Sequence, residues 1–381
     1  MKFIFSFWFF VSLTSLQHCI PSETQPIPLG DDSSNVTITL SVVGDIMCHA
    51  PQFEYSRVSK DSFDFNPAFR YITEYLSTSD FTFGNLETVT AGKEEKYSGY
   101  PMFNSPSSLL DALKNAGFDL LTTSNNHSLD KGERGIRKTI AELKNRSINY
   151  VGTYLNQADR DSIRIFDIKG ISIAFLTYSY GTNGNPIPKG KSYLINLIDV
   201  DLVRRDIEKA KSLKPDLILV HYHFGEEYQR EPNSFQRMVV DSTVKMGADI
   251  IIGGHPHVLQ PFQFIKSDQS ILDSVFVAYS LGNFISNQRK RYTDAGGILT
   301  ITLRKNVLNN TVKIINLEFT PTWIFKGYTG IRNEFIIIPS IAASNDTLFS
   351  FLNKNHRLKL VESIEDAKQV LPKYNTRVNF K

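Results

Sequence analysis

Cysteine is scarce in this sequence, and neither sign of charge is in clear excess. The chain has 381 residues with two cysteines, Cys19 and Cys48, so no disulfide framework is expected. Its 42 basic and 39 acidic residues give a net charge of +3. This balance argues against a dedicated nucleic-acid binder, because such proteins concentrate a basic surplus. Hydrophobic residues make up 41% of the chain, which is enough for a large buried core without cross-links.

Long apolar runs are also absent. The stretch from Phe3 to Leu13 is too short for a transmembrane helix, which needs about 20 apolar residues, and is typical of a signal-peptide core. The segment Leu16-Gln17-His18-Cys19 resembles a bacterial lipoprotein cleavage box. We therefore predict an exported, membrane-anchored lipoprotein, with a signal peptide at residues 1–20, a lipid at Cys19 and a flexible tether at residues 21–35. An ordinary secretory peptide and an uncleaved anchor remain alternatives.

Strand and helix patterns alternate after the tether, with no repeats and no low-complexity segment. Strands are predicted at residues 37–43, 80–83, 118–123, 163–168, 171–178, 216–220, 249–254, 262–265, 275–279, 297–303, 312–320 and 335–338. Helices are predicted at residues 63–76, 107–116, 132–146, 200–213, 235–246 and near 346–355. This alternation predicts an α/β fold, and the hairpins predict mixed sheets. We expect a main domain at residues 36–305 and C-terminal elements at 306–381 that complete it or are appended to it.

Polar residues follow five of the predicted strands. The segments are Gly44-Asp45, Gly84-Asn85-Leu86-Glu87, Asn125-Asn126-His127, His221-Tyr222-His223 and Gly254-His255-Pro256-His257. In open α/β sheets, ligands bind outside the carboxyl ends of the strands. Carboxylates and imidazoles without a thiolate cluster indicate a catalytic ion or ion pair rather than a structural zinc. Each segment alone fits a cap, a turn or a surface residue, but six of the eight histidines lie at or near these strand ends.

This arrangement is similar to that of calcineurin-like metallophosphoesterases. His49 lies two residues later than the family's first histidine, and Asn85 stands where the family has Asp, with Glu87 as a candidate substitute. A narrower resemblance covers roughly residues 37–300 and is to the capsule-synthesis CapA-type (poly-gamma-glutamate) family. It rests on the segments Gly44-Asp45-Ile46-Met47, Gly84-Asn85-Leu86-Glu87, Asn125 to Gly132, His223 to Tyr228, Gly254 to Gln260 and Ser280 to Phe284. The resemblance implies a four-layer α/β/β/α metallophosphatase-like sandwich and a link to capsule or poly-gamma-glutamate assembly.

The resemblance also implies roles for individual residues. The metal ligands would be Asp45, Glu87, Asn126, His223, His255 and His257, and they would hold one or two divalent ions such as Mn, Fe or Zn. His127 would be the general acid. Candidates for orienting the ligands or contacting substrate are Asn85, His221, His49 and Tyr228, with His221 as an alternative ligand. Tyr228 and Arg230 also fit a packed and a solvated side chain, and the run Arg289-Lys290-Arg291 fits a solvated loop or a clamp for an anionic substrate.

Two hypotheses of function follow. The first is a metal-dependent hydrolase that cleaves a phosphoester or an amide of a surface polymer or its precursor. The second is a non-catalytic, membrane-anchored assembly or export factor for such a polymer. Both predict an anionic surface polymer and proteins of a polymer-synthesis complex as partners, and neither predicts nucleic acid. The pairing of Asn126 with His127 favours the hydrolase, because a scaffold has no need of a proton donor beside a metal site.

Overall fold

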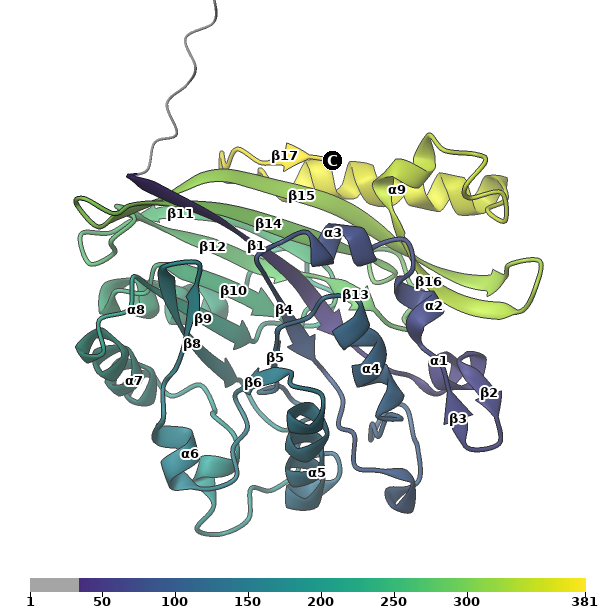
Figure 1. Cartoon of the computed structure of the whole chain (residues 1–381), viewed down its shortest axis with the longest axis horizontal. Coiled ribbons are helices and arrows are strands. Elements are labelled where there is room, and N and C mark those ends of the chain that lie inside the picture. The colour runs from purple at the N-terminus through teal and green to yellow at the C-terminus, as the bar shows by residue number, and fades with distance from the viewer. Residues whose placement is uncertain (1–33) are drawn as a thin grey trace, which may run out of the picture. The chain divides into compact units, whose positions relative to one another are not determined.

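Two β-sheets packed face to face form the centre of the protein, whose computed structural model describes residues 34–381 (Figure 1). The predictions for residues 1–20 and for most of the tether therefore lie outside the described residues. Within residues 34–381, none of the helices combines the length and the apolar composition that crossing a bilayer requires.

The larger sheet has nine strands and contains both the first and the last strand of the described chain. Its main order is β16-β15-β14-β1-β4-β5-β6, with β13 paired to β1 and β17 paired to β15. The strands are β16 (Asn333–Pro339), β15 (Thr311–Tyr328), β14 (Ala295–Asn306), β1 (Asn35–Ile46), β4 (Phe81–Leu86), β5 (Leu120–Thr122), β6 (Asn149–Val151), β13 (Asn283–Ile285) and β17 (Asn379–Phe380). Strands β1, β4, β5 and β6 are parallel, whereas β14, β15 and β16 join them as antiparallel neighbours.

The smaller sheet has six strands in the order β11-β12-β10-β9-β8-β7. They are β11 (Leu259–Lys266), β12 (Ser274–Leu281), β10 (Ile250–Gly254), β9 (Leu217–His223), β8 (Ile171–Ser179) and β7 (Arg164–Ile168). Its four central strands are parallel, and β7 and β11 close its edges in the antiparallel direction. A separate short hairpin consists of β2 (Arg57–Ser59) and β3 (Ser62–Phe63).

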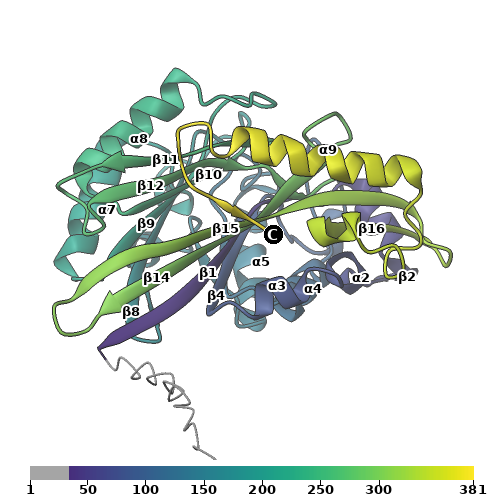
Figure 2. The same ribbon diagram turned by 90° about the horizontal axis from the view of Figure 1, so that it is seen from above.

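The helices cover the outer faces of both sheets, except for the last one, which packs against β15 and β11 and adds Ala367 and Val370 to the core between the sheets. The helices are α1 (Ala50–Tyr55), α2 (Asn66–Phe69), α3 (Thr73–Ser77), α4 (Ser108–Asn115), α5 (Gly132–Asn145), α6 (Gln157–Asp161), α7 (Val200–Ser212), α8 (Ser234–Met246) and α9 (Lys354–Val370), with 3-10 turns at η1 (Lys93–Glu95), η2 (Ser192–Leu194) and η3 (Ser340–Ala343). Helix α9 packs along β15, as the view from above shows (Figure 2).

Alternating side chains on the strands create the layers. Inward side chains of both sheets fill the central core, among them Leu40, Val42 and Phe83 from the larger sheet and Phe175, Leu219 and Ile252 from the smaller one. Because successive side chains point to opposite faces, Val43 of β1 packs on the other side with α4 and α5. Ile46 joins it there because the register of β1 shifts between Val43 and Ile46. Helices α7 and α8 cover the outer face of the smaller sheet in the same way. The order of layers is α/β/β/α with mixed sheets, which confirms the predicted fold class.

The prediction of one helix at residues 63–76 was wrong. Phe63 belongs to β3, and two short helices, α2 and α3, follow it. Pro67 lies in the first turn of α2, where its missing N–H costs nothing, but a helix cannot continue through it from residue 63. The side chain of Asp64 also accepts the N–H of Asn66 at 3.0 Å, which fixes a turn before α2.

The prediction of a helix near residues 346–355 was also wrong. Residues 346–351 form turns, and α9 begins only at Lys354. The side chain of Asn353 accepts the N–H of His356 at 3.0 Å and therefore caps the start of α9. The hairpin predicted at residues 163–178 and the helices predicted near residues 107–116, 132–146, 200–213 and 235–246 are confirmed.

Candidate metal centre

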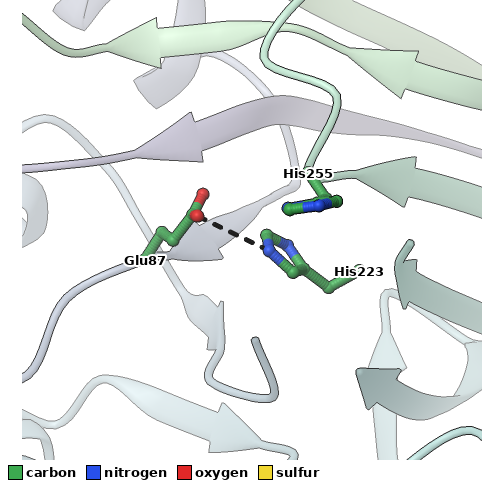
Figure 3. Close-up of side chains that lie close together, drawn as sticks. All are labelled: Glu87, His223 and His255. Atoms are coloured by element: carbon green, nitrogen blue, oxygen red, sulfur yellow. Dashed lines mark ion pairs between the residues drawn. The ribbon is translucent and has the colours of Figure 1, made fainter. Parts of the chain in front are cut away.

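The carboxyl ends of parallel strands from both sheets meet at one place. In the larger sheet, Asp45 of β1 pairs with Asn85 of β4 on one side and with Asn283 of β13 on the other. In the smaller sheet, His223 at the end of β9 pairs with Gly254 at the end of β10. Glu87 follows β4, and His255 and His257 follow β10. Figure 3 shows Glu87, His223 and His255 pointing toward one another from the two sheets.

The six predicted metal ligands are brought together and are buried. Nε2 of His223 lies 3.5 Å from Oε1 of Glu87 and 2.8 Å from Oδ1 of Asn126. Nε2 of His257 lies 3.8 Å from the same oxygen of Glu87. On its other side, Nδ1 of His257 lies 3.2 Å from Oδ2 of Asp45. Side chains from segments more than 200 residues apart thus share one small volume.

A second set of amides holds these side chains in place. Nδ2 of Asn85, predicted to orient ligands or to contact substrate, lies 2.8 Å from Oδ1 of Asp45 and 3.1 Å from Nδ1 of His223. Oδ1 of Asn283 lies 3.0 Å from Nδ1 of His257. Such partners fix the ring orientation of a ligating histidine.

Three buried atoms at this place have no hydrogen-bond partner within residues 34–381. They are both carboxylate oxygens of Glu87 and Nδ1 of His255. Burial, with the charge of Asp45, raises the pKa of Glu87 to about 8. A buried carboxylate without donors is costly, and the oxygens of Glu87 and Nδ1 of His255 are therefore suited to binding a cation.

The imidazoles are suited to supply lone pairs. Burial lowers the pKa of His223 to about 3 against the opposing charge of Asp45, and burial holds the pKa of His255 well below its ordinary value. His257 differs, because the carboxylates of Glu87 and Asp45 outweigh its burial and raise its pKa to about 9. Burial alone would raise the pKa of Asp45, but its hydrogen bond with His257 and the charge of that ring hold it well below the usual range.

The donor set fits a divalent transition ion. Three sets each offer one atom per residue within 4.8 Å of the others: Glu87, His223 and His255; Asp45, Glu87 and His257; and Glu227, His255 and His257. Mixed nitrogen and oxygen donors suit Mn, Fe or Zn. Because the sets share residues, the geometry accommodates one ion or two. Glu227 is an exposed member that we did not single out as a ligand from the sequence.

His127 lies beside this cluster and is 3% exposed. Its Nδ1 lies 2.7 Å from Oδ2 of Asp130, and the same carboxylate oxygen accepts the N–H of Phe103 at 2.7 Å. The ring of Phe103 meets the imidazole edge-on at 4.6 Å. The other ring nitrogen, Nε2, has only a distant contact with the amide of Asn183 at 3.5 Å. The arrangement fixes the ring through Nδ1 and leaves Nε2 to act on a ligand.

The remaining predicted residues lie around the cluster. His221 is buried, and its Nδ1 lies 3.3 Å from the hydroxyl of Thr177 rather than against a predicted ligand. His49 caps α1 and is absent from the three ligand sets, although its ring approaches Phe103 at 5.1 Å. Tyr228 is half-exposed with its ring 6.3 Å from that of His257. Arg230 instead donates to the carbonyl of Asp366 in α9.

Tyr180 is a site residue that the sequence analysis missed. Its half-exposed ring lies 4.5 Å from that of His255, and its N–H donates to the carbonyl of His223 at 2.9 Å. Tyr180 directly follows β8, which is parallel to β9 and ends at the same edge. The rule that ligands bind outside the carboxyl ends of strands, which located the histidines, therefore applied to this position as well.

The turn after β10 is locally strained. His255 and His257 have φ values of 95° and 59°, a region that non-glycine residues rarely adopt. Strain of this kind persists where the surroundings hold a residue for a function. Gly254 permits the turn to approach β1, because a Cβ at this position would lie 2.7 Å from Oδ1 of Asp45.

The substitution Gly254→Ala is accordingly expected to displace Asp45. We expect a loss of bound metal and a fall in the free energy of unfolding of about 1–3 kcal/mol, the usual cost of overpacking. Metal analysis and denaturant unfolding would measure both. Gly181→Ala is the matched control, because a Cβ there meets nothing within 4 Å, and its effect should stay within about 0.5 kcal/mol. Equal behaviour of the two variants would contradict the packing argument.

The comparison with protein families agrees with this geometry. The model of a family described as bacterial capsule synthesis protein PGA_cap matches residues 39–288. The chain belongs to this family. The matched range begins within β1 and ends just after β13, so it contains every predicted metal ligand.

Two similar proteins are named for capsule or PGA biosynthesis. The chain is 32% identical over 279 residues to the capsule biosynthesis protein CapA of Bacillus anthracis, covering 71% of this chain and 65% of that protein. It is 28% identical to the PGA biosynthesis protein CapA of Bacillus subtilis, covering 72% of this chain and 70% of that protein. Among solved structures, the Haemophilus influenzae NAD nucleotidase matches at a TM-score of 0.48 and 12% identity, over 91% of this chain and 57% of that one.

Proposed function

We propose that the protein is an exported, metal-dependent hydrolase that cleaves a phosphoester or an amide of a surface polymer or its precursor during capsule biosynthesis. The observation that carries the proposal is a group of buried atoms without a hydrogen-bond partner in residues 34–381, the Glu87 oxygens and Nδ1 of His255, next to a histidine held by a carboxylate. The metal would be held by Asp45, Glu87, Asn126, His223, His255 and His257. Bound divalent ions supply a Lewis acid for the scissile group and lower the pKa of an attacking water.

The residues of the chain provide the proton transfer and the exclusion of water. The Asp130 carboxylate holds the His127 ring through Nδ1, so that a proton on Nε2 can pass to the leaving oxygen or nitrogen as its bond to phosphorus or carbon breaks. The oxygen of the attacking water forms the new bond, and its proton leaves to solvent. The buried ligands and the ring of Phe103 keep bulk water from this side of the cluster.

A non-catalytic assembly factor is the competing function. An assembly factor would explain the fold, but it would give no reason for a buried His127–Asp130 pair beside the candidate metal centre. Metal analysis of the purified protein, combined with a hydrolysis screen on phosphoesters and poly-gamma-glutamate, separates the two. Turnover that requires the metal supports the hydrolase, and a metal-loaded protein that cleaves none of these substrates supports the assembly factor.

We further propose that a lipid at Cys19 holds the protein at the cell envelope. Cys19→Ser is expected to move the protein from the detergent phase to the aqueous phase in a partitioning experiment, or to block processing of the signal peptide. The buried Cys48 provides the matched control, because Cys48→Ser leaves any lipidation site untouched. If Cys19→Ser partitions like the unaltered protein, the anchor is not at Cys19.

A further inference from the structure

Three consecutive cations follow β13, and the structure gives them different partners. Arg289 points inward, where it donates to the carbonyl of Ile324 at 2.7 Å and lies 3.5 Å from Asp294. Arg291 points to α9, where it pairs with Asp366 at 3.0 Å. Both guanidinium groups are therefore paired with groups of the protein itself.

Lys290 lies between them and has no such partner. Within residues 34–381, no carboxylate lies within ion-pair distance of its Nζ, and its side chain is exposed. Nζ instead lies 5.8 Å from the centre of the Tyr228 ring. Since that ring lies 6.3 Å from the ring of His257, Tyr228 is a neighbour both of Lys290 and of the metal centre.

The loop that carries Lys290 is fixed to the metal centre. Asn283, which contacts Nδ1 of His257, also donates to Oε1 of Gln288 at 2.9 Å and to the carbonyl of Thr293 at 2.8 Å. The N–H of Asn287 points to Nδ1 of His49 at 3.3 Å. These contacts on both sides of Lys290 fix the position of the loop relative to the predicted ligands.

The backbone of Tyr228 is also fixed to the metal centre. It has a φ of 68°, and its N–H donates to the carbonyl of Pro256 at 2.8 Å, between the two histidines after β10. A strained backbone that keeps an aromatic ring half-exposed is not explained by core packing. The backbone places the face of the Tyr228 ring beside Lys290 and near His257.

We propose that Lys290 and Tyr228 form an anion subsite that selects substrates with a second negative group next to the bond held at the metal centre. The compact ammonium of Lys290 would pair with a carboxylate or phosphate, and the Tyr228 ring would pack against the adjoining methylene groups of the chain. The inference rests on the proposed function for the position of the substrate. It predicts a preference for a polyanionic chain over an uncharged one of the same backbone.

Binding rather than turnover tests this subsite. The probes are a fluorescein-labelled poly-gamma-glutamate oligomer and its methyl ester, measured by anisotropy on the metal-loaded full chain. Lys290→Ala is expected to weaken binding of the acid form about three- to fivefold, the upper range for a solvent-exposed ion pair, and to leave the ester unaffected. Lys290→Arg should restore binding to within about twofold. Arg291→Ala, one residue away but directed to α9, should bind like the unaltered protein.

The outcomes separate this subsite from other roles of the loop. Unchanged binding of the acid oligomer by Lys290→Ala would overturn the subsite, because Lys290 would then make no contact with the ligand. An equal loss of binding in Arg291→Ala would overturn it as well, because the attraction would then come from diffuse positive charge. A loss of metal in Lys290→Ala would overturn it too, because Lys290 would then act on the metal centre rather than on the substrate. Turnover is measured separately on p-nitrophenyl phosphate, bis(p-nitrophenyl) phosphate and the oligomer. If the binding pattern is as expected but none of these is cleaved, the result supports the subsite and contradicts the proposed hydrolase.

Discussion

The double substitution His255→Ala with His257→Ala is expected to remove bound metal almost completely. The unaltered protein should hold one or two divalent transition ions per chain after reconstitution. Each of the three ligand sets contains at least one of these two histidines, so no set survives the change intact. Elemental analysis after gel filtration would measure the ion content, and circular dichroism would show whether the fold persists.

His49→Ala is the matched control for this experiment. His49 is a histidine near the same centre, but it belongs to none of the three ligand sets and serves as the cap of α1. We expect it to retain its metal. If the double variant keeps its full ion content, or if His49→Ala loses as much, the assignment of ligands is wrong.

Much of the centre could be predicted from the sequence because its residues follow strands directly. Asp45, Glu87 and His223 lie within two residues of the end of β1, β4 and β9, and parallel strands bring their ends together. The layered fold was predictable for a related reason, since alternating residues such as Val42 and Val43 must face two different apolar layers.

The partners of these residues could not be predicted in the same way. Asn283 lies in one of the motifs, yet its contact with His257 exists because β13 pairs with β1, whose Asp45 is 238 positions earlier in the chain. Asp130 follows His127 by three residues, a spacing that allows a contact without requiring it. The positive φ values of His255 and His257 depend on the approach of Gly254 to Asp45, for which the sequence shows only the glycine.

Two wrong helix predictions could have been avoided, because the sequence contains residues that mark where the helices start. Pro67 inside the predicted helix at residues 63–76 marks a helix start rather than an interior, and Asn353 marks the start of α9. These errors left the metal centre unaffected, because neither segment contributes a ligand.

The substitution His127→Ala is expected to lower turnover by about 10²–10⁴-fold, the usual range for loss of a general acid. Metal content should remain nearly unchanged, because the His127 side chain belongs to none of the ligand sets. The variants Glu87→Ala and His223→Ala should behave differently and lose metal and activity together. Turnover of each variant, measured beside its ion content, separates a proton donor from a ligand.

The leaving group gives a sharper test of the same role. A leaving group with a low pKa needs no proton in the transition state, so the loss in His127→Ala should shrink for nitrophenyl esters and grow for alkyl esters or amides. Asp130→Asn should reproduce the pattern in weaker form, because the ring keeps Nε2 but loses the carboxylate at Nδ1. A constant loss across leaving groups would assign His127 to binding, and unaltered turnover on a verified substrate would exclude this route of proton transfer. If polymer production in cells is normal both in His127→Ala and in the His255→Ala, His257→Ala variant, the assembly factor becomes the better account, because neither the proton donor nor the metal would then be needed.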